Sequence, residues 1–201
     1  LYLKAHYPME FIIGVLNNGG GFYSTEMYLH EARMLGAKVE APCVNKSNLL
    51  SVLEGENTIY IGFYLVRDLE EKVVLAFLEE RNKGGSYKSL EDFVNRCEIS
   101  KEQLVILVRI GAFRFSGKSK QGLMWEVHRL LGGAKKTKVD FQLFPIQGRK
   151  YKMPKLDELN FEDAFDQMEL LGFPLCSPFA LLKEELPSSL LAKNLLKFLG
   201  K

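Results

Sequence analysis

The stretch that most constrains this chain is residues 100–127, SKEQLVILVRIGAFRFSGKSKQGLMWEV, which has the pattern of two helices joined by a tight glycine turn. Ser100 and Gln103 have the spacing of a capping box, so a helix is expected to begin there. Gly111 stands where a helix needs a left-handed terminal residue. A second helix is expected from about Ser119. The predicted unit is a helical hairpin with a broad apolar face, formed by Leu104, Ile106, Leu107, Val108 and Ile110.

This hairpin also has features of a phosphate site. A glycine turn that leads into a helix N-terminus presents backbone N–H groups, which suit a phosphate. Lys118 and Lys120 stand beside the expected helix start and add positive charge. The alternative is an ordinary helical hairpin with solvated lysines, and the stretch alone does not separate the two interpretations.

The distribution of charge favours a polyanionic partner. Residues 114–155 contain eleven Lys or Arg and two acidic residues, a net charge of +9, whereas residues 1–113 carry −3 and residues 156–201 carry −4. Such a local excess is the electrostatic footprint of a nucleic-acid-binding region. The competing interpretation is a flexible basic loop around residues 132–138.

Composition places the chain among ordinary globular proteins. Of 201 residues, 47% are hydrophobic and 26% are charged, with no apolar run near the ~18 residues of a membrane helix. We therefore expect no membrane partner and a cytoplasmic location. Cys43, Cys97 and Cys176 lack metal-like spacing and fit a reducing compartment. Because the chain begins at Leu1, we expect it to be a piece of a longer polypeptide.

Hydrophobic periodicity and turn residues predict a mainly helical chain with a small β-hairpin. Ser89 is expected to cap the helix that follows it, and Asn160 the last predicted helix. The segment 38–42 is expected to be extended, because it precedes Pro42. Helices are expected at about 8–16, 22–35, 69–81 and 160–171, and strands at 49–53 and 58–63 around the turn 54–57.

Three motifs resemble bacterial DNA polymerase III α subunits of the DnaE-type branch, the C family of polymerases. They are KAHYPMEF at 4–11, YLHEARMLG at 28–36 and PCVNKS at 42–47. The resemblance implies four regions: the end of the fingers (1–46), a tandem helix-hairpin-helix DNA-binding domain (47–131), a basic linker with a clamp-binding motif (132–156), and a helical connector to an OB-fold (157–201).

The first of the two hairpins departs from the pattern of this family. Its segment, 62–71, has Asp68 and Glu70 where the family has hairpin glycines. Acidic side chains oppose a phosphate, and loss of glycine hinders close approach of the backbone. We expect this hairpin to keep its packing role and lose most phosphate contact. Arg67, at the position of a family lysine, is the remaining candidate.

The second hairpin matches the family better. Ile110-Gly111-Ala112-Phe113 resembles the A-G-A-F of the family, and the next residue is Arg114 where the family usually has Asp. The contact with DNA is therefore expected to have shifted towards this hairpin. The predicted DNA-binding residues are Gly111, Ala112, Phe113, Arg114, Lys118 and Lys120, with Arg67 from the first hairpin.

A clamp-binding peptide is expected in the basic linker. In the family this position holds a short Gln-x-x-Leu-Phe-like peptide that docks on the sliding clamp, the β subunit. Here Leu143 and Phe144 match its apolar residues, whereas an Asp replaces the Gln. The alternative is that the two apolar residues pack on the core of the domain itself. The predicted clamp-binding residues are Asp140, Phe141, Gln142, Leu143 and Phe144.

No catalytic or metal site is expected in this chain. In the family the aspartates that hold two Mg²⁺ ions lie in the palm, upstream of Leu1, so the fragment should be inactive alone and need no cofactor. The acidic pairs at 70–71, 79–80, 91–92 and 184–185 are interpreted as solvated or capping groups. His6 is expected to have a packing role, and neither His30 nor His128 has the neighbours of a metal ligand.

The resemblance implies part of a DNA-directed DNA polymerase, which grips duplex DNA behind the active site, tethers to the clamp and works with other holoenzyme subunits. The competing class is a non-enzymatic helical interaction domain whose hairpins only pack. Salt-dependent binding to duplex of random sequence would separate the two.

Overall fold

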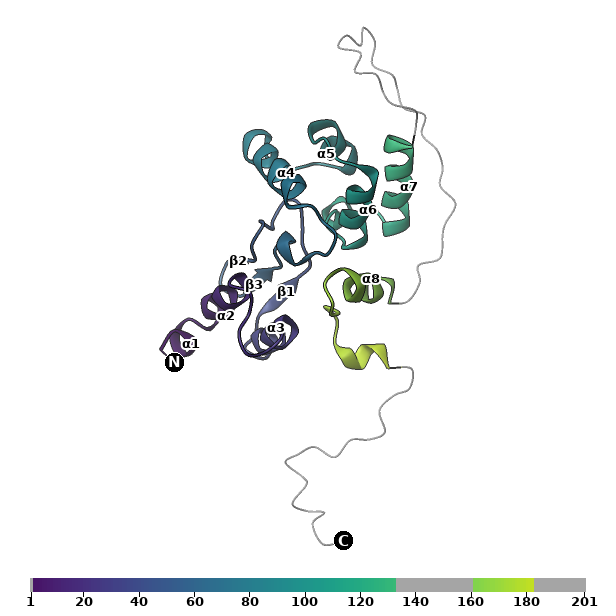
Figure 1. Cartoon of the computed structure of the whole chain (residues 1–201). Coiled ribbons are helices and arrows are strands. Elements are labelled where there is room, and N and C mark those ends of the chain that lie inside the picture. Colours follow the sequence, from purple (N-terminus) through teal and green to yellow (C-terminus); the bar gives the residue numbers. More distant parts are fainter. Residues whose placement is uncertain (1, 133–160, 183–201) are drawn as a thin grey trace.

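The computed structural model describes residues 2–132 and 161–182 (Figure 1). In these residues the chain is mainly helical with a small sheet, as the sequence predicted. None of the described helices is long and apolar enough to cross a bilayer. The elements are α1 Tyr2–His6, α2 Pro8–Asn17, α3 Thr25–Met34, β1 Lys38–Glu40, β2 Val52–Glu54, β3 Thr58–Tyr60, η1 Phe63–Leu65, α4 Glu71–Gly84, α5 Leu90–Arg96, α6 Lys101–Arg109, η2 Arg114–Ser116, α7 Lys120–Leu131, α8 Glu162–Leu170 and η3 Pro178–Leu181.

The sheet lies between the N-terminal helices and the later helices (Figure 1). Strands β2 and β3 form the predicted hairpin, with Leu53 opposite Ile59. The expected extended segment is strand β1, which pairs in parallel with β3 and gives the order β1-β3-β2. The third strand was not predicted, because its partner lies some 20 residues further along the chain.

Helices α4 to α7 form the second part of the fold (Figure 1). Their N-termini follow local signals: Ser89, Ser100 and Ser119 each accept a hydrogen bond from the amide three residues later. The caps at Ser89 and Ser100 were predicted, and the helix start near Ser119 was predicted without its cap. Helix α3 begins at Thr25, later than expected, because Ser24 caps it. The helices close over a cluster of buried aromatic rings, namely Phe63, Phe77, Tyr87, Phe93 and Phe113.

The PCVNKS motif at 42–47 connects the sheet to these helices. Asn45 donates to the carbonyl of Tyr87 (2.9 Å) and accepts from its amide (2.8 Å). Arg81 of α4 donates to the carbonyls of Val44 (2.9 Å) and Ser47 (2.7 Å). These side chains satisfy backbone groups of an irregular loop, so the motif holds the sheet and the helices in a fixed relation.

Helix α8 packs against α6 and lies beside α7 (Figure 1). The residue at its N-cap is Phe161, which has φ = 67° and makes no side-chain cap. The expectation that Asn160 caps this helix was therefore wrong. The side chains of α8 also contact the second hairpin. A capping pattern depends only on neighbouring residues and does not predict such contacts.

Candidate nucleic-acid interface

The second hairpin ends α6 with a turn built on Gly111. This residue has φ = 78°, and the space that a Cβ would fill holds no other atom within 4 Å. The Gly111 amide donates to the carbonyl of Val108 (3.0 Å), and the Ala112 amide donates to that of Leu107 (2.9 Å). This is the Schellman arrangement, in which both amides satisfy the end of the preceding helix. The turn is open to a close approach, but these two N–H groups are already used.

Two of the predicted DNA-binding residues have buried side chains. Ala112 and Phe113 are both 0% exposed. The Phe113 ring packs against Phe93 with 5.1 Å between centroids, and the Ala112 carbonyl accepts from the amide of Val44 (3.2 Å). These residues fix the hairpin to the core, and their side chains do not reach its surface.

Arg114 connects the hairpin to the end of β1. Its guanidinium donates to the carbonyls of Ala41 (2.8 Å) and Pro42 (2.9 Å), and it lies 3.3 Å from a carboxylate oxygen of Glu40. Hydrogen bonds of a charged donor to otherwise open carbonyls stabilise this junction. Arg114, which stands where the family usually has Asp, therefore holds the hairpin to the end of β1 in this conformation.

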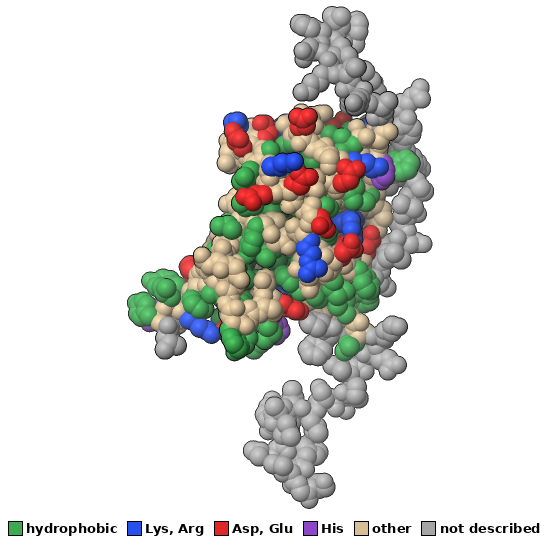
Figure 2. Space-filling view, viewed as in Figure 1, with side chains coloured by type: hydrophobic (Ala, Val, Ile, Leu, Met, Phe, Trp, Pro, Cys, Tyr) green, Lys and Arg blue, Asp and Glu red, His purple; other side chains and the backbone are tan. Residues whose placement is uncertain are grey.

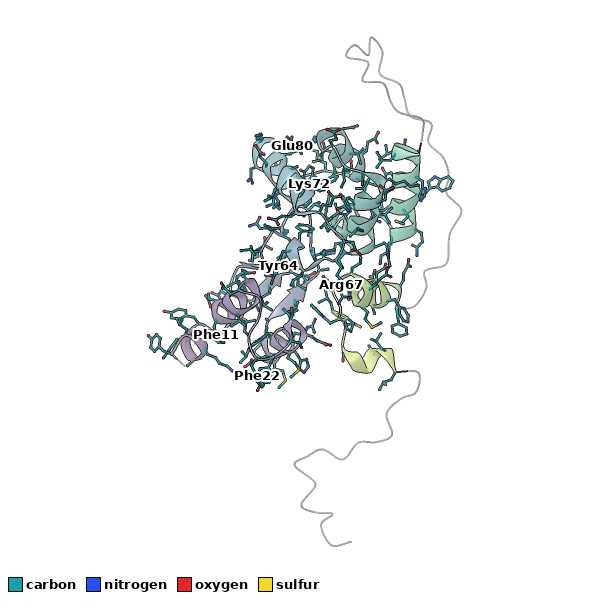
Figure 3. All side chains as sticks on the ribbon, viewed as in Figure 1. Phe11, Phe22, Tyr64, Arg67, Lys72 and Glu80 are labelled. Atoms are coloured by element: carbon teal, nitrogen blue, oxygen red, sulfur yellow. The ribbon has the colours of Figure 1, made fainter. Side chains whose placement is uncertain are left out.

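The first hairpin keeps its turn despite its missing glycines. Asp68 has φ = 60°, a left-handed conformation that Asp tolerates better than most residues. The Arg67 amide donates to the carbonyl of Leu170 (2.8 Å), and its side chain lies beside the end of α8 (Figure 3). The sequence predicted the loss of glycine here but not the contact with α8.

Gln103 joins the two hairpins, and this link was not predicted from the sequence. Its side chain is buried, donates to the carbonyl of Asp68 (2.8 Å) and accepts from the amide of Glu70 (2.8 Å). Its own amide meets the Ser100 cap (3.3 Å). The capping box predicted the helix start, whereas the side chain of Gln103 crosses to the other hairpin. The signal available in the sequence was a glutamine four residues before Leu107, a spacing that places it on the apolar face of the helix.

Comparisons with known proteins agree with this geometry. The helix-hairpin-helix motif family matches residues 36–123, which include both hairpins. The chain is 29% identical over 185 residues to the DNA polymerase III subunit alpha of Aquifex aeolicus, covering 90% of this chain, and 35% identical over 141 residues to that of Thermus aquaticus, covering 68%. This chain belongs to the DNA polymerase III α-subunit family. The resemblance inferred from the three motifs is thus confirmed.

The chain spans only a small part of these family members. It covers 16% of the Aquifex protein and 11% of the Thermus protein. An error-prone DNA polymerase of Mycobacterium bovis is also similar, at 31% identity over 126 residues, 62% of this chain and 12% of that protein.

The two lysines of the second hairpin both have acidic partners in this α-subunit segment. Lys118 lies 2.7 Å from Glu126, and its side chain is 47% exposed. Lys120 lies 2.5 Å from Asp163 and 2.7 Å from Asp166, and its side chain is only 13% exposed. Burial lowers the pKa of Lys120, but hydrogen bonds and charges from both aspartates outweigh burial, so the pKa is raised. Lys118 is thus the more accessible cation.

The basic excess predicted from sequence is distributed unevenly. On the face in Figure 2, Lys and Arg side chains are interspersed with acidic ones. Every described Lys or Arg from residue 114 to 132 lies within 4 Å of a carboxylate: Arg114, Lys118, Lys120 and Arg129. The other cations of the basic region, and the predicted clamp-binding residues 140–144, lie outside the described residues.

Each acidic pair within the described ranges has at least one residue in an ion-pair or capping contact. Glu79 pairs with Lys83 (2.6 Å), and Glu80 pairs with Arg96 (3.2 Å). Asp92 accepts from the amide of Lys88 (2.9 Å). Among the residues that the structure describes, no three His, Cys, Asp or Glu side chains are grouped to hold a metal ion.

Proposed function

We propose that this chain holds duplex DNA by its phosphate backbone within a DNA polymerase III α subunit. The observation that carries the proposal is the open, left-handed turn at Gly111, inside a region that matches the helix-hairpin-helix motif. Gln103 and the PCVNKS loop fix both hairpins to one core. The hairpins are therefore held in a fixed relation, which suits contact with the regularly spaced phosphates of a duplex. The matching relatives are polymerase subunits, which supports a DNA ligand.

The contacts at the second hairpin are proposed to come from the start of α7. The amides of Gly111 and Ala112 are engaged, and the Ser119 side chain accepts from the amide of Gly122. The donors proposed for phosphate are therefore the amides of Lys120 and Gln121, which lie in the first turn of α7, before its intrahelical hydrogen bonds begin. The Lys118 ammonium is exposed enough to add charge. Amides and lysines contact phosphates without reading bases, so binding should be independent of sequence.

A charge placed in the Gly111 turn tests this proposal. Asn and Asp both tolerate the left-handed conformation, so Gly111→Asn and Gly111→Asp differ mainly in charge. One carboxylate about 4 Å from a phosphate costs about 1 kcal/mol in water, so the Asp variant should bind random-sequence duplex about fivefold more weakly than the Asn variant at low salt.

Gly55 provides the matched control. It has φ = 67° and open surroundings, but it lies in the β2–β3 turn. Gly55→Asp and Gly55→Asn should bind duplex equally well. Equal binding by the two Gly111 variants, with binding by the parent chain intact, would place the interface away from this hairpin.

The alternative function is a helical interaction domain with hairpins that only pack. The engaged amides of Gly111 and Ala112 favour it. The two functions differ in salt dependence, because phosphate contacts release counterions and give a linear fall of log affinity with log salt. Binding without this slope would support the alternative.

We also propose that residues 140–144 tether the chain to a sliding clamp. Two large apolar side chains, Leu143 and Phe144, could each contribute about 1.5–3 kcal/mol of burial, less the cost of ordering the peptide. A dissociation constant of about 1 μM, or roughly −8 kcal/mol, is expected. Asp140→Gln should tighten binding, because an amide can donate hydrogen bonds and a carboxylate cannot.

The clamp test is titration of the chain against its cognate clamp. Leu143→Ala with Phe144→Ala should abolish binding and leave the far-ultraviolet circular dichroism spectrum unchanged. A double variant that binds as the parent does, or unfolds, would assign these residues to the core.

For the whole protein we propose template-directed DNA synthesis in the cytoplasm, together with other holoenzyme subunits. The metal-binding aspartates, with their Mg²⁺, are proposed to lie in the palm, outside this chain. The proposed regions are the end of the fingers (1–46), the tandem hairpins (47–131), the linker (132–156) and the connector (157–201). With primer-template, Mg²⁺ and four triphosphates, this chain alone should extend nothing, and extension by pure chain would contradict the proposal.

A further inference from the structure

Helix α8 presents a row of carboxylates to the second hairpin. We call Glu162, Asp163, Asp166 and Glu169 the acidic row. Its members contact residues that begin α7 and end α6. The contacts are Asp163 to Lys120 (2.5 Å), Asp166 to Lys120 (2.7 Å) and to Arg109 (2.7 Å), Glu169 to Arg109 (2.5 Å), and Glu162 to Gln121 (2.6 Å).

These contacts occupy the helix start that the proposed function assigns to DNA. Lys120 and Gln121 are the first two residues of α7, and the side chains of both bind carboxylates of α8. A groove of about 440 Å³ remains between the hairpin and α8, with Gly111 and Lys118 on one side and Asp163 and Gln167 on the other. A phosphate that enters this groove would meet α8.

The balance of charge at this contact is negative. Two cations, Arg109 and Lys120, face the four carboxylates of the acidic row. Lys120 and Asp166 are 13% and 11% exposed, so salt screens their attraction less than it screens a surface pair. A duplex phosphate is therefore opposed by the acidic row, and Lys120 cannot bind it while the row is docked.

We propose that α8 is an intramolecular competitor of DNA, whose acidic row imitates phosphates at the start of α7 and is displaced when duplex binds. This inference rests on the proposed duplex-binding function. The carboxylates take the place of phosphate oxygens as acceptors for Lys120 and Gln121. From the sequence, Lys120 was predicted to bind DNA, and only the docked α8 reveals the carboxylates that compete for it.

Neutral isosteres test the proposal. Asp163→Asn with Asp166→Asn should raise the affinity of the full chain for a random-sequence 20-base-pair duplex about fivefold or more at low salt. One added phosphate contact should steepen the slope of log affinity against log salt by about 0.9. Adding Lys120→Met to the double variant should remove both changes.

The matched control removes two carboxylates elsewhere. Glu54 and Glu79 form exposed ion pairs, on β2 and α4, away from the hairpin. Glu54→Gln with Glu79→Gln gives the same change of net charge and should alter affinity less than about twofold. An equal gain in the control would reduce the effect to net charge and overturn the proposal.

Hydrogen exchange provides a second measurement on the unmodified chain, which does not depend on how the variants fold. Saturating duplex should speed amide exchange in residues 162–170 while α6 stays protected. Unchanged or slower exchange in α8 with duplex bound would overturn the proposal.

If the parent chain binds duplex and the double variant binds no more tightly, the competitor proposal fails and the proposed function stands. If neither binds, both fail, whereas binding by the double variant alone supports the competitor.

Discussion

Replacement of Gln103 by Leu should destabilise the chain well beyond an ordinary surface substitution. The side chain is 7% exposed and joins the hairpins through two hydrogen bonds of 2.8 Å, to the carbonyl of Asp68 and from the amide of Glu70. Leucine has similar size and suits a helix interior, so the packing of α6 should survive. The substitution removes the two links and leaves two backbone groups without these partners.

The expected cost follows from those two groups. A hydrogen bond contributes about 0.5–1.5 kcal/mol net, and an unsatisfied buried partner costs about 1–3 kcal/mol. Because Asp68 and Glu70 are exposed residues, water can recover part of this loss. We therefore expect a decrease of about 2–4 kcal/mol in the free energy of unfolding. For a chain of this length that corresponds to a fall of roughly 4–16 °C in Tm.

Urea and thermal unfolding followed by circular dichroism measure this effect. Gln121→Leu is the control, since it removes one side-chain hydrogen bond, to Glu162, at the edge of the fold. It should cost at most about 1 kcal/mol. Hydrogen exchange should also show a specific loss of protection at the Glu70 amide. A Gln103→Leu chain as stable as the control would refute the idea that this side chain fastens the hairpins together.

Three further substitutions test stability. A Cβ at Gly62 would lie less than 3.0 Å from backbone atoms of Leu50 and Ser51, so Gly62→Ala should cost about 1–3 kcal/mol in chemical denaturation. A Cβ at Gly14, inside α2, would have no atom within 4 Å, so Gly14→Ala should instead stabilise the chain by up to about 1 kcal/mol. A Gly62→Ala chain more stable than the Gly14→Ala chain would contradict this packing. The hydrogen bond from Lys38, with help from Arg114, holds the pKa of Glu40 below its ordinary 4.5. Its contribution to stability is thus present above pH 4.5 and lost as the pH falls through the folded value, so Glu40→Gln should flatten the acid limb of an unfolding-against-pH curve.

Helix starts and stops were predictable because their signals lie within one turn of chain. Ser89, Ser100 and Ser119 are each followed by the amide that they cap, and Gly111 ends α6 in the left-handed conformation. The β2–β3 hairpin was predictable for the same reason, because its turn residues separate the two strands directly.

The availability of the predicted DNA-binding groups was not predictable in this way. Whether a lysine is free depends on what packs against it, and the partners of Lys120 come from a helix more than 40 residues later. The same holds for Arg114, whose guanidinium meets carbonyls more than 70 residues earlier. Charge along the sequence indicated a polyanion, but charge in space depends on which acidic residues the fold brings near.

The sequence by itself therefore determined the hairpin as a unit: its caps, its glycine turn, its apolar face and its family. Only the tertiary structure decided that Gln103 links the two hairpins, that β1 completes the sheet, and that α8 covers the start of α7. The physical reason is that caps and turns are satisfied by near neighbours in the chain. A buried polar group or an ion pair is satisfied by whichever partner the packing of the whole chain places within about 3 Å.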